Sequence, residues 1–176
     1  MRLFAAIGIP KTALPSIARV SALLALSGAR ILPCENLHLT IKFIGETREN
    51  DLSGIGTALA GVHFRQFGVT ISGAGAFPND KFPRAIWLGG KSEGAGELAA
   101  KVDDALSFLH LNREKFTLHL TVARSDGNAN IGDFLQRTGE VCSFEVSSFL
   151  LMESTLSRTG AKYRTIREFP AEEQDG

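Results

Sequence analysis

The segments NLHLTIKF at residues 36–43 and TLHLTVAR at residues 117–124 are two copies of one pattern. In each copy a histidine, a leucine and a threonine are followed by a β-branched residue, and the two histidines are His38 and His119. Residues of this kind favour strands, whose side chains alternate between two faces. Each copy therefore predicts a strand that presents a histidine and a threonine together on its polar face.

The same alternation assigns the neighbouring side chains. In the first copy it predicts a polar face of His38, Thr40 and Lys42 and a core face of Leu37, Leu39, Ile41 and Phe43. In the second copy it predicts a polar face of Thr117, His119 and Thr121 and a core face of Leu118, Leu120 and Val122. In two lobes related by a pseudo-two-fold axis, the two His-Thr pairs would meet across a cleft.

Further strands and helices are expected around these two. Apolar runs bounded by turn residues predict strands over residues 2–9, 30–32, 37–44, 64–77, 84–88, 116–123, 143–152 and 163–169. Helical spacing of apolar residues predicts helices over residues 11–26, 49–60, 94–109 and 131–137. Strands outnumber helices and the turns are short, so the sequence predicts an α+β fold with largely antiparallel sheets.

The chain is expected to form one domain with two related lobes. A helix followed by a His-Leu-Thr strand occurs twice, and no low-complexity linker separates the two occurrences. We therefore predict a single bilobal domain over residues 1–170, with outer helices around a central cleft. The polar residues 171–176 predict a flexible tail.

Composition excludes several classes of protein. The 176 residues include 19 Lys+Arg and 19 Asp+Glu, which argues against a broad basic surface that wraps long nucleic acid. No apolar run is long enough to span a membrane, and Pro10, Lys11 and Pro15 interrupt the apolar start, which argues against a secretory signal. Cys34 and Cys142 have neither disulfide-scaffold nor zinc-ligand spacing, so a reducing cytoplasm is expected.

Two facing imidazoles favour proton transfer over metal binding. The patterns that contain His38 and His119 include no acidic partner, and divalent metal sites take three or four ligands. An ordinary histidine has a pKa near 6.5, so one ring can give a proton while the other accepts one near neutral pH. The hydroxyls of Thr40 and Thr121 are suited to donate hydrogen bonds to phosphoryl oxygens. Such an arrangement can open a cyclic phosphodiester without a metal or another cofactor.

The sequence resembles the two-histidine (2H) phosphoesterases, and within them the LigT-like RNA 2',3'-cyclic phosphodiesterases, also called 2'-5' RNA ligases. The resemblance rests on the paired tetrapeptides, on RLFAAI at residues 2–7, on ENL at 35–37 and on FIGE at 43–46. It implies a bilobal 2H phosphoesterase fold. It also implies hydrolysis of RNA 2',3'-cyclic phosphate ends to 2'-phosphate ends, and in some members the joining of tRNA halves through a 2'-5' linkage.

The resemblance also implies residue roles. By position, His38 corresponds to the proton donor and His119 to the proton acceptor, and Thr40 and Thr121 would hold the phosphate. Arg124, five residues after His119, corresponds to a basic residue near the phosphate. No metal, cofactor or membrane is implied. A monomer is expected, because one chain supplies both histidines.

Several alternatives stay open on the sequence alone. A 2H phosphoesterase of this kind could act on small cyclic nucleotides or ADP-ribose cyclic phosphate, and a non-catalytic RNA-end binder would keep the phosphate contacts. Among single residues, Trp87 and Tyr163 could stack on a base or pack in the core, and Lys42 could steer an anion or lie in solvent. The last hairpin has a basic character, and two histidines outside the pattern are expected to be structural or exposed; these residues are Arg158, Lys162, Arg164, Arg167, His63 and His110.

Overall fold

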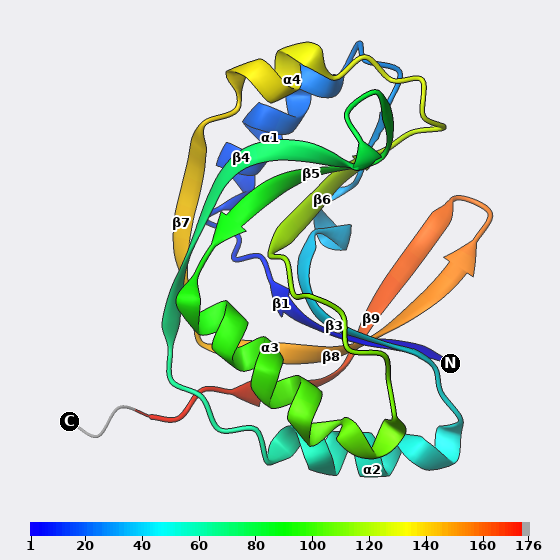
Figure 1. Ribbon diagram of the computed structural model, residues 1–176, viewed down its shortest axis with the longest axis vertical. Helices are drawn as coiled ribbons and strands as arrows, with labels where there is room; N and C mark the ends of the chain where they lie inside the picture. The colour runs from blue at the N-terminus through cyan, green and yellow to red at the C-terminus, as the bar shows by residue number, and fades with distance from the viewer. Residues whose placement is uncertain (174–176) are drawn as a thin grey trace.

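Nine strands form one antiparallel sheet in the computed structural model, which describes residues 1–173 (Figure 1). In chain order the strands are β1 (Arg2–Gly8), β2 (Arg30–Ile31), β3 (His38–Glu46), β4 (Phe67–Asn79), β5 (Phe82–Lys91), β6 (His119–Arg124), β7 (Glu140–Val146), β8 (Ser148–Ser157) and β9 (Gly160–Pro170). The helices are α1 (Leu14–Ser21), α2 (Glu49–Ala60), α3 (Glu93–Ala105) and α4 (Gly132–Arg137), and short 3₁₀ turns occupy Ala22–Leu24, Cys34–Asn36 and Ser107–Leu109. The order across the sheet is β7-β4-β5-β6-β3-β1-β8-β9, and β2 pairs with β6.

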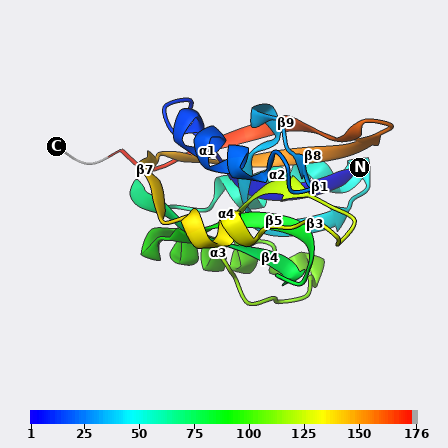
Figure 2. The same cartoon turned by 90° about the horizontal axis from the view of Figure 1, so that it is seen from above.

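The sheet consists of two halves that meet at a narrow joint. The His38 half contains β3, β1, β8 and β9, and the His119 half contains β7, β4, β5 and β6 together with β2. β3 and β6 pair at a single position, Leu39 with Leu120, and both leucines are fully buried. Helices α1 and α4 lie at one end of the sheet, and α2 and α3 lie at the other (Figures 1 and 2). This architecture confirms the predicted α+β fold with two lobes of antiparallel sheet.

Helix α3 packs against β3 and β4 and so borders the joint between the halves. Its first turn is capped by Ser92, whose Oγ accepts a hydrogen bond from the backbone N–H of Ala95 at 3.2 Å. Apolar residues at helical spacing, including Leu98 and Val102, are buried against the sheet, as predicted from the sequence.

One extra residue after each His-Leu-Thr pattern moves the side chains that follow it to the opposite faces of the sheet from those predicted. On β3, Ala6 pairs with Thr40 and Ala5 pairs with Lys42, so Ile41 is an inserted residue, a β-bulge. A bulge shifts the alternation by one position, so Thr40 and Lys42 point to opposite faces. The predicted faces of Lys42 and Phe43 are therefore wrong. Phe43 shares the face of Thr40 and is 63% exposed.

The second copy has the same irregularity. On β6, Thr121 pairs with Trp87 and Ala123 pairs with Ile86, so Val122 is the inserted residue. The bulge turns Arg124, which would otherwise point away, onto the face of Thr121. Phe43 and Arg124 are thus equivalent positions, each five residues after its histidine.

Other sequence predictions need smaller corrections. The predicted strand 143–152 is two strands, β7 and β8, because the chain crosses at Ser147 from the His119 half to the His38 half while the apolar alternation continues. The predicted helix 11–26 shortens to α1 and a 3₁₀ turn, whereas α2 has the predicted bounds. Residues 171–173 have no regular structure, and the rest of the predicted tail lies outside the described residues. Within residues 1–173 no helix combines the length and apolar character needed to cross a membrane.

Candidate active site

The first residues of β3 and β6 are the two pattern histidines, and these strands are neighbours in the sheet. His38 and His119 line one cavity of about 520 Å³ at the joint between the halves. The same cavity is lined by Thr40, Thr121 and Arg124. All five residues predicted for the site from the sequence therefore lie around one space.

Both imidazoles are held by the same local hydrogen bond. Nδ1 of His38 lies 2.8 Å from the backbone carbonyl of Asn36, and Nδ1 of His119 lies 3.0 Å from that of Thr117. A carbonyl oxygen only accepts, so each Nδ1 carries a proton and donates it. Nε2 of the neutral ring is then unprotonated and can accept a proton, and the charged ring can give one back from the same atom.

Aromatic rings pack against each histidine. The ring centroids of Phe4 and Tyr163 lie 4.9 and 4.8 Å from that of His38. On the other side, Phe77 lies 5.1 Å and Trp87 lies 6.3 Å from His119, both edge to face. Trp87 and Tyr163 thus pack beside the two histidines, and the half-buried Tyr163 also lines the cavity. These rings restrict the rotation of the imidazoles and keep Nε2 oriented.

The cavity is cationic. Arg2, Arg30 and Arg124 line it, and none of its lining residues carries a carboxylate. The pKa of His38 lies below its ordinary value, mainly because burial disfavours the charged ring, and the charges of Arg124 and His119 act in the same direction. The hydrogen bond to the Asn36 carbonyl opposes this shift. A bound anion would relieve the repulsion among these cations.

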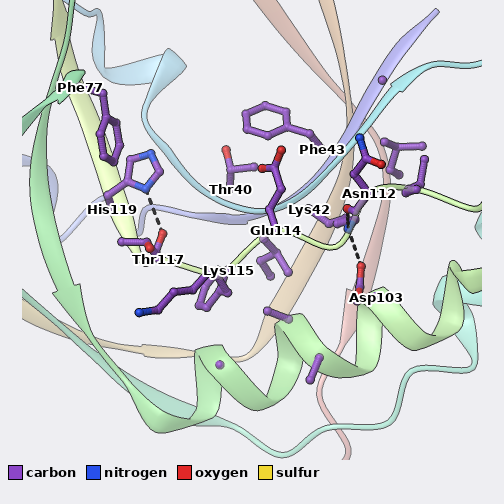
Figure 3. A pocket seen from close by; sticks show the side chains of 18 residues that line it. Thr40, Lys42, Phe43, Phe77, Asp103, Asn112, Glu114, Lys115, Thr117 and His119 are labelled. Atoms are coloured by element: carbon purple, nitrogen blue, oxygen red, sulfur yellow. Dashed lines mark hydrogen bonds and ion pairs between the residues drawn. The ribbon is translucent and has the colours of Figure 1, made fainter.

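A second cavity of about 700 Å³ borders the first and shares Thr40, Phe43, Phe77 and His119 with it (Figure 3). It lies between β3, helix α3 and the segment that leads into β6. In Figure 3 the imidazole of His119, bonded to Thr117, stands on one side of this space.

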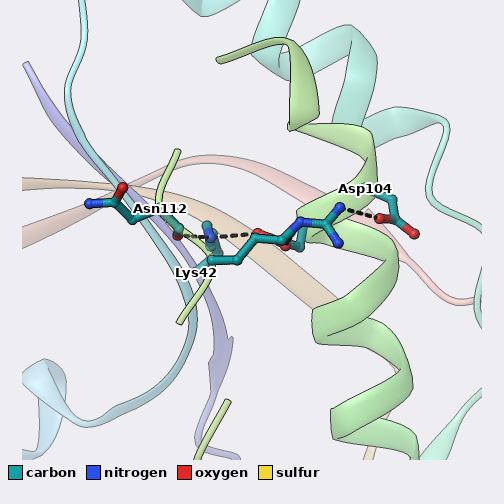
Figure 4. Close-up of polar contacts among 5 residues, drawn as sticks. Lys42, Asp104 and Asn112 are labelled. Carbon is teal, nitrogen blue, oxygen red and sulfur yellow. Dashed lines mark hydrogen bonds and ion pairs between the residues drawn. The ribbon is translucent and has the colours of Figure 1, made fainter. Parts of the chain in front are cut away.

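Lys42 lines this second cavity (Figure 3), its side chain is only 12% exposed, and Figure 4 shows its polar contacts. Its Nζ lies 2.5 Å from Asp103 and donates a hydrogen bond to the backbone carbonyl of Asn112 at 2.9 Å. Arg113 joins the network through ion pairs with Asp103 and Asp104. Both sequence interpretations of Lys42, an anion-steering group and a solvated lysine, are wrong. Lys42 instead ties the segment before β6 to helix α3.

Similarity to known proteins agrees with this geometry. The chain is 35% identical over 175 residues to an RNA 2',3'-cyclic phosphodiesterase of Archaeoglobus fulgidus, with 96% of this chain and 99% of the relative covered. The family model described as "LigT like Phosphoesterase" matches residues 7–87.

The chain belongs to the LigT-like phosphoesterases.

Other LigT-like proteins show the same relationship. An RNA 2',3'-cyclic phosphodiesterase of Aeropyrum pernix is 40% identical over 147 residues, which cover 78% of this chain and 83% of the relative. The crystal structure of TT0787 from Thermus thermophilus superposes with a TM-score of 0.82 at 26% identity and covers 97% of both chains. Escherichia coli LigT complexed with 3'-AMP has the same TM-score of 0.82 at 22% identity over 98% of both chains, which shows a shared fold.

The strand and motif patterns did not identify several other residues that line the cavity, among them Arg2, Arg30, Phe43 and Phe77. Phe43 could have been found, because its distance from His38 along the chain equals that of Arg124 from His119. The other three reach the cavity through strand pairing, which no short motif reveals.

The remaining weak candidates lie outside this cavity. Arg164 pairs with Glu153, Arg167 donates to the carbonyl of Gly56, and Arg158 and Lys162 do not line it. His63 and His110 are exposed, as expected. Within residues 1–173 no group of three or more His, Cys, Asp or Glu side chains is arranged to hold a metal ion.

Proposed function

We propose that this chain hydrolyses RNA 2',3'-cyclic phosphate ends to 2'-phosphate ends by proton transfer between two histidines. The observation that supports this most directly is the matched hydrogen bonding of His38 and His119 around one cationic cavity. Two LigT-like relatives at 35% and 40% identity carry the name RNA 2',3'-cyclic phosphodiesterase. A phosphodiester is an anion, so a cavity with three arginines and no carboxylate is suited to bind it.

In the proposed mechanism His119 is the proton acceptor and His38 the proton donor. Nε2 of His119 takes a proton from a water molecule as its oxygen attacks phosphorus. The bond from phosphorus to the 3'-oxygen breaks, and Nε2 of His38 gives its proton to that oxygen. The product carries a 2'-phosphate, and exchange with solvent restores both rings.

The other predicted residues act on the charge of the phosphate. The hydroxyls of Thr40 and Thr121 donate hydrogen bonds to the non-bridging oxygens, whose negative charge grows in the transition state. The guanidinium of Arg124, on the same face as Thr121, stabilises the same charge. Their contribution is binding and orientation, and the two histidines transfer the protons.

The same proton transfers would also allow the reverse reaction, in which two RNA fragments are joined through a 2'-5' linkage. A 5'-hydroxyl that replaces the attacking water would lose its proton to His119 and form a 2'-5' phosphodiester as the 3'-oxygen leaves. Two RNA fragments such as tRNA halves would be joined in this way. We propose that the chain acts as a monomer, because residues of one chain complete the cavity. We also propose that it works in the cytoplasm, because the spacing of Cys34 and Cys142 fits a reducing environment.

Incubation with a short RNA that ends in a 2',3'-cyclic phosphate tests the proposal. We expect a product with a 2'-phosphate, identified against 2'- and 3'-phosphate standards, at a rate that EDTA leaves unchanged. Loss of turnover in EDTA would contradict the metal-independent mechanism, and a 3'-phosphate would contradict the direction of ring opening. Turnover of small cyclic nucleotides without turnover of RNA would identify the alternative substrate class.

The lowered pKa of His38 predicts a particular pH dependence. A proton donor must be protonated, and the pKa of His38 in the free protein lies below its ordinary value. Because the mechanism needs His38 protonated and His119 unprotonated, we expect a bell-shaped profile of kcat/KM between about pH 5 and about pH 9. The limb set by His38 should lie at lower pH than an ordinary histidine would give. The bound phosphodiester anion favours the imidazolium, so the same limb should lie at higher pH in the profile of kcat.

Steady-state kinetics across this range check the prediction. Arg124→Gln removes one charge that lowers the pKa of His38, and should move the limb of kcat/KM that His38 sets to higher pH. Arg158→Gln removes a charge outside the cavity and serves as the control. A profile of kcat/KM whose limbs stay in place in Arg124→Gln would mean that the protonation of His38 does not control the rate.

A further inference from the structure

Arg30 and Arg124 form a pair of like charges on the wall of the cavity. The two residues are direct partners in the pairing of β2 with β6, so their side chains project from the same face of the sheet. Like charges in this position are unfavourable, because neighbouring side chains of an antiparallel pair lie close together. Both line the cavity, and none of the lining residues offers a carboxylate to separate them.

The guanidinium of Arg30 reaches from the His119 half to the turn of the β8–β9 hairpin in the His38 half. Its Nη1 donates a long hydrogen bond of 3.5 Å to the backbone carbonyl of Thr159. The same nitrogen would lie 3.1 Å from a Cβ added at Gly160, so the guanidinium rests directly against the turn. Asn36 ties the same region together through a 3.1 Å bond from its Nδ2 to the carbonyl of Ala161.

Most of the hydrogen-bonding capacity of Arg30 is unused. A guanidinium has five N–H donors, and within residues 1–173 the carbonyl of Thr159 is the one acceptor that Arg30 contacts. Arg30 forms no ion pair with the acidic residues of that range. A planar fork of free donors at the edge of a cationic cavity matches the oxygens of a phosphate group.

The two arginines have different neighbours in the cavity. Arg124 lies near enough to His38 for its charge to oppose the imidazolium, which places it beside the reacting phosphate of the proposed function. Arg30 reaches to the hairpin turn, whose residues Gly160 and Ala161 line the same cavity. The last nucleotide of an RNA with a cyclic end carries two phosphate groups, the cyclic one and the one on its 5'-oxygen. The cavity volume is in the range of sites that hold one small ligand.

We propose that Arg30 binds the phosphate on the 5' side of the terminal nucleotide and so makes the enzyme select RNA ends over nucleoside 2',3'-cyclic phosphates. The proposal rests on the proposed function, because it takes the cyclic phosphate to lie between His38 and His119. It assigns Arg30 a role in substrate binding, with the chemical step left to the histidines.

Two substrates that differ by one phosphate test whether Arg30 binds the phosphate on the 5' side. Uridine 2',3'-cyclic phosphate with a free 5'-hydroxyl lacks the second phosphate, and its 5'-phosphorylated form has it. For Arg30→Gln we expect KM of the 5'-phosphorylated substrate to rise about 10-fold or more, with kcat unchanged and the unphosphorylated substrate affected less than about two-fold. Arg30→Lys keeps a charge without the fork and should recover part of the loss.

Arg158→Gln is the matched control. Arg158 lies in the same hairpin turn and is exposed, but it does not line the cavity, so its removal tests for a general charge effect. Equal losses on both substrates in Arg30→Gln would overturn the proposal, because they would place Arg30 at the reacting phosphate or in the support of the hairpin. No loss on either substrate would overturn it as well.

Binding measurements test the role of Arg30 independently of the proposed function. Calorimetry with uridine 2',5'-bisphosphate and uridine 2'-monophosphate needs no turnover. We expect the wild type to bind the bisphosphate more tightly and Arg30→Gln to lose that preference. Absence of hydrolysis of both cyclic substrates by the wild type would count against the proposed function, whereas a preference that survives Arg30→Gln would count against the role of Arg30 alone.

Discussion

Replacement of His119 or His38 by alanine is expected to lower kcat by about 10²–10⁴ for RNA with a 2',3'-cyclic phosphate end. Each imidazole is held by a backbone carbonyl through Nδ1 and packed against aromatic rings, so its Nε2 is already oriented for proton transfer. Because the two rings act in one step, the double variant should be little worse than either single variant. Single-turnover kinetics measure these effects without a contribution from product release.

His63→Ala is the matched control for both substitutions. His63 is an exposed histidine that contacts Glu172 at 3.1 Å and lies outside the cavity, so its loss should leave kcat unchanged. Circular dichroism and thermal unfolding of each variant check that the fold is intact. A rate near that of the wild type in either His38→Ala or His119→Ala would exclude the two-histidine mechanism.

The largest loss of stability is expected for Phe149→Ala, at about 3–5 kcal/mol in the free energy of unfolding. Phe149 lies in β8 with no exposed surface. Its ring centroid lies 4.8 Å from that of Phe169, on which it stacks, and 5.7 Å from that of Phe64. Its removal deletes apolar contacts and leaves a cavity that the surrounding strands cannot fill completely. Chemical denaturation at equilibrium measures the change.

Phe108→Ala provides the comparison for this core substitution. Phe108 is 51% exposed, so the same deletion there should change the free energy of unfolding by less than about 1 kcal/mol. A loss of similar size in both variants would mean that Phe149 does not occupy a rigid core position.

Strand alternation predicted the fold and most of the site. The helix over residues 49–60 and the strands that contain His38 and His119 follow directly from local patterns, and these two strands bring the histidines and threonines together. The prediction failed after Thr40, where a single inserted residue exchanged the faces of Lys42 and Phe43. A bulge is stabilised by pairing with the neighbouring strand, so the strand's own sequence gives no sign of it.

Contacts between segments far apart in the chain also could not be predicted from the sequence patterns. The alternation pattern predicted that Lys42 would steer an anion or lie in solvent, whereas its side chain forms an ion pair with Asp103 on helix α3. Arg30 is separated from Thr159 by more than a hundred residues, and its place in the cavity depends on the pairing of β2 with β6. Such contacts are fixed by the tertiary arrangement, which a pattern within one strand does not contain.

The paired bulges make the two halves of the cavity different. In a cleft built from two identical halves, the two histidines would be interchangeable, and a cyclic phosphate could enter in either of two orientations. The bulges bring one residue of each half to the same place beside its threonine, and these residues differ: Arg124 in one half and Phe43 in the other. Arg124 and Phe43 line the same cavity, so the two halves differ in charge at these equivalent positions and the symmetry of the repeat is broken there.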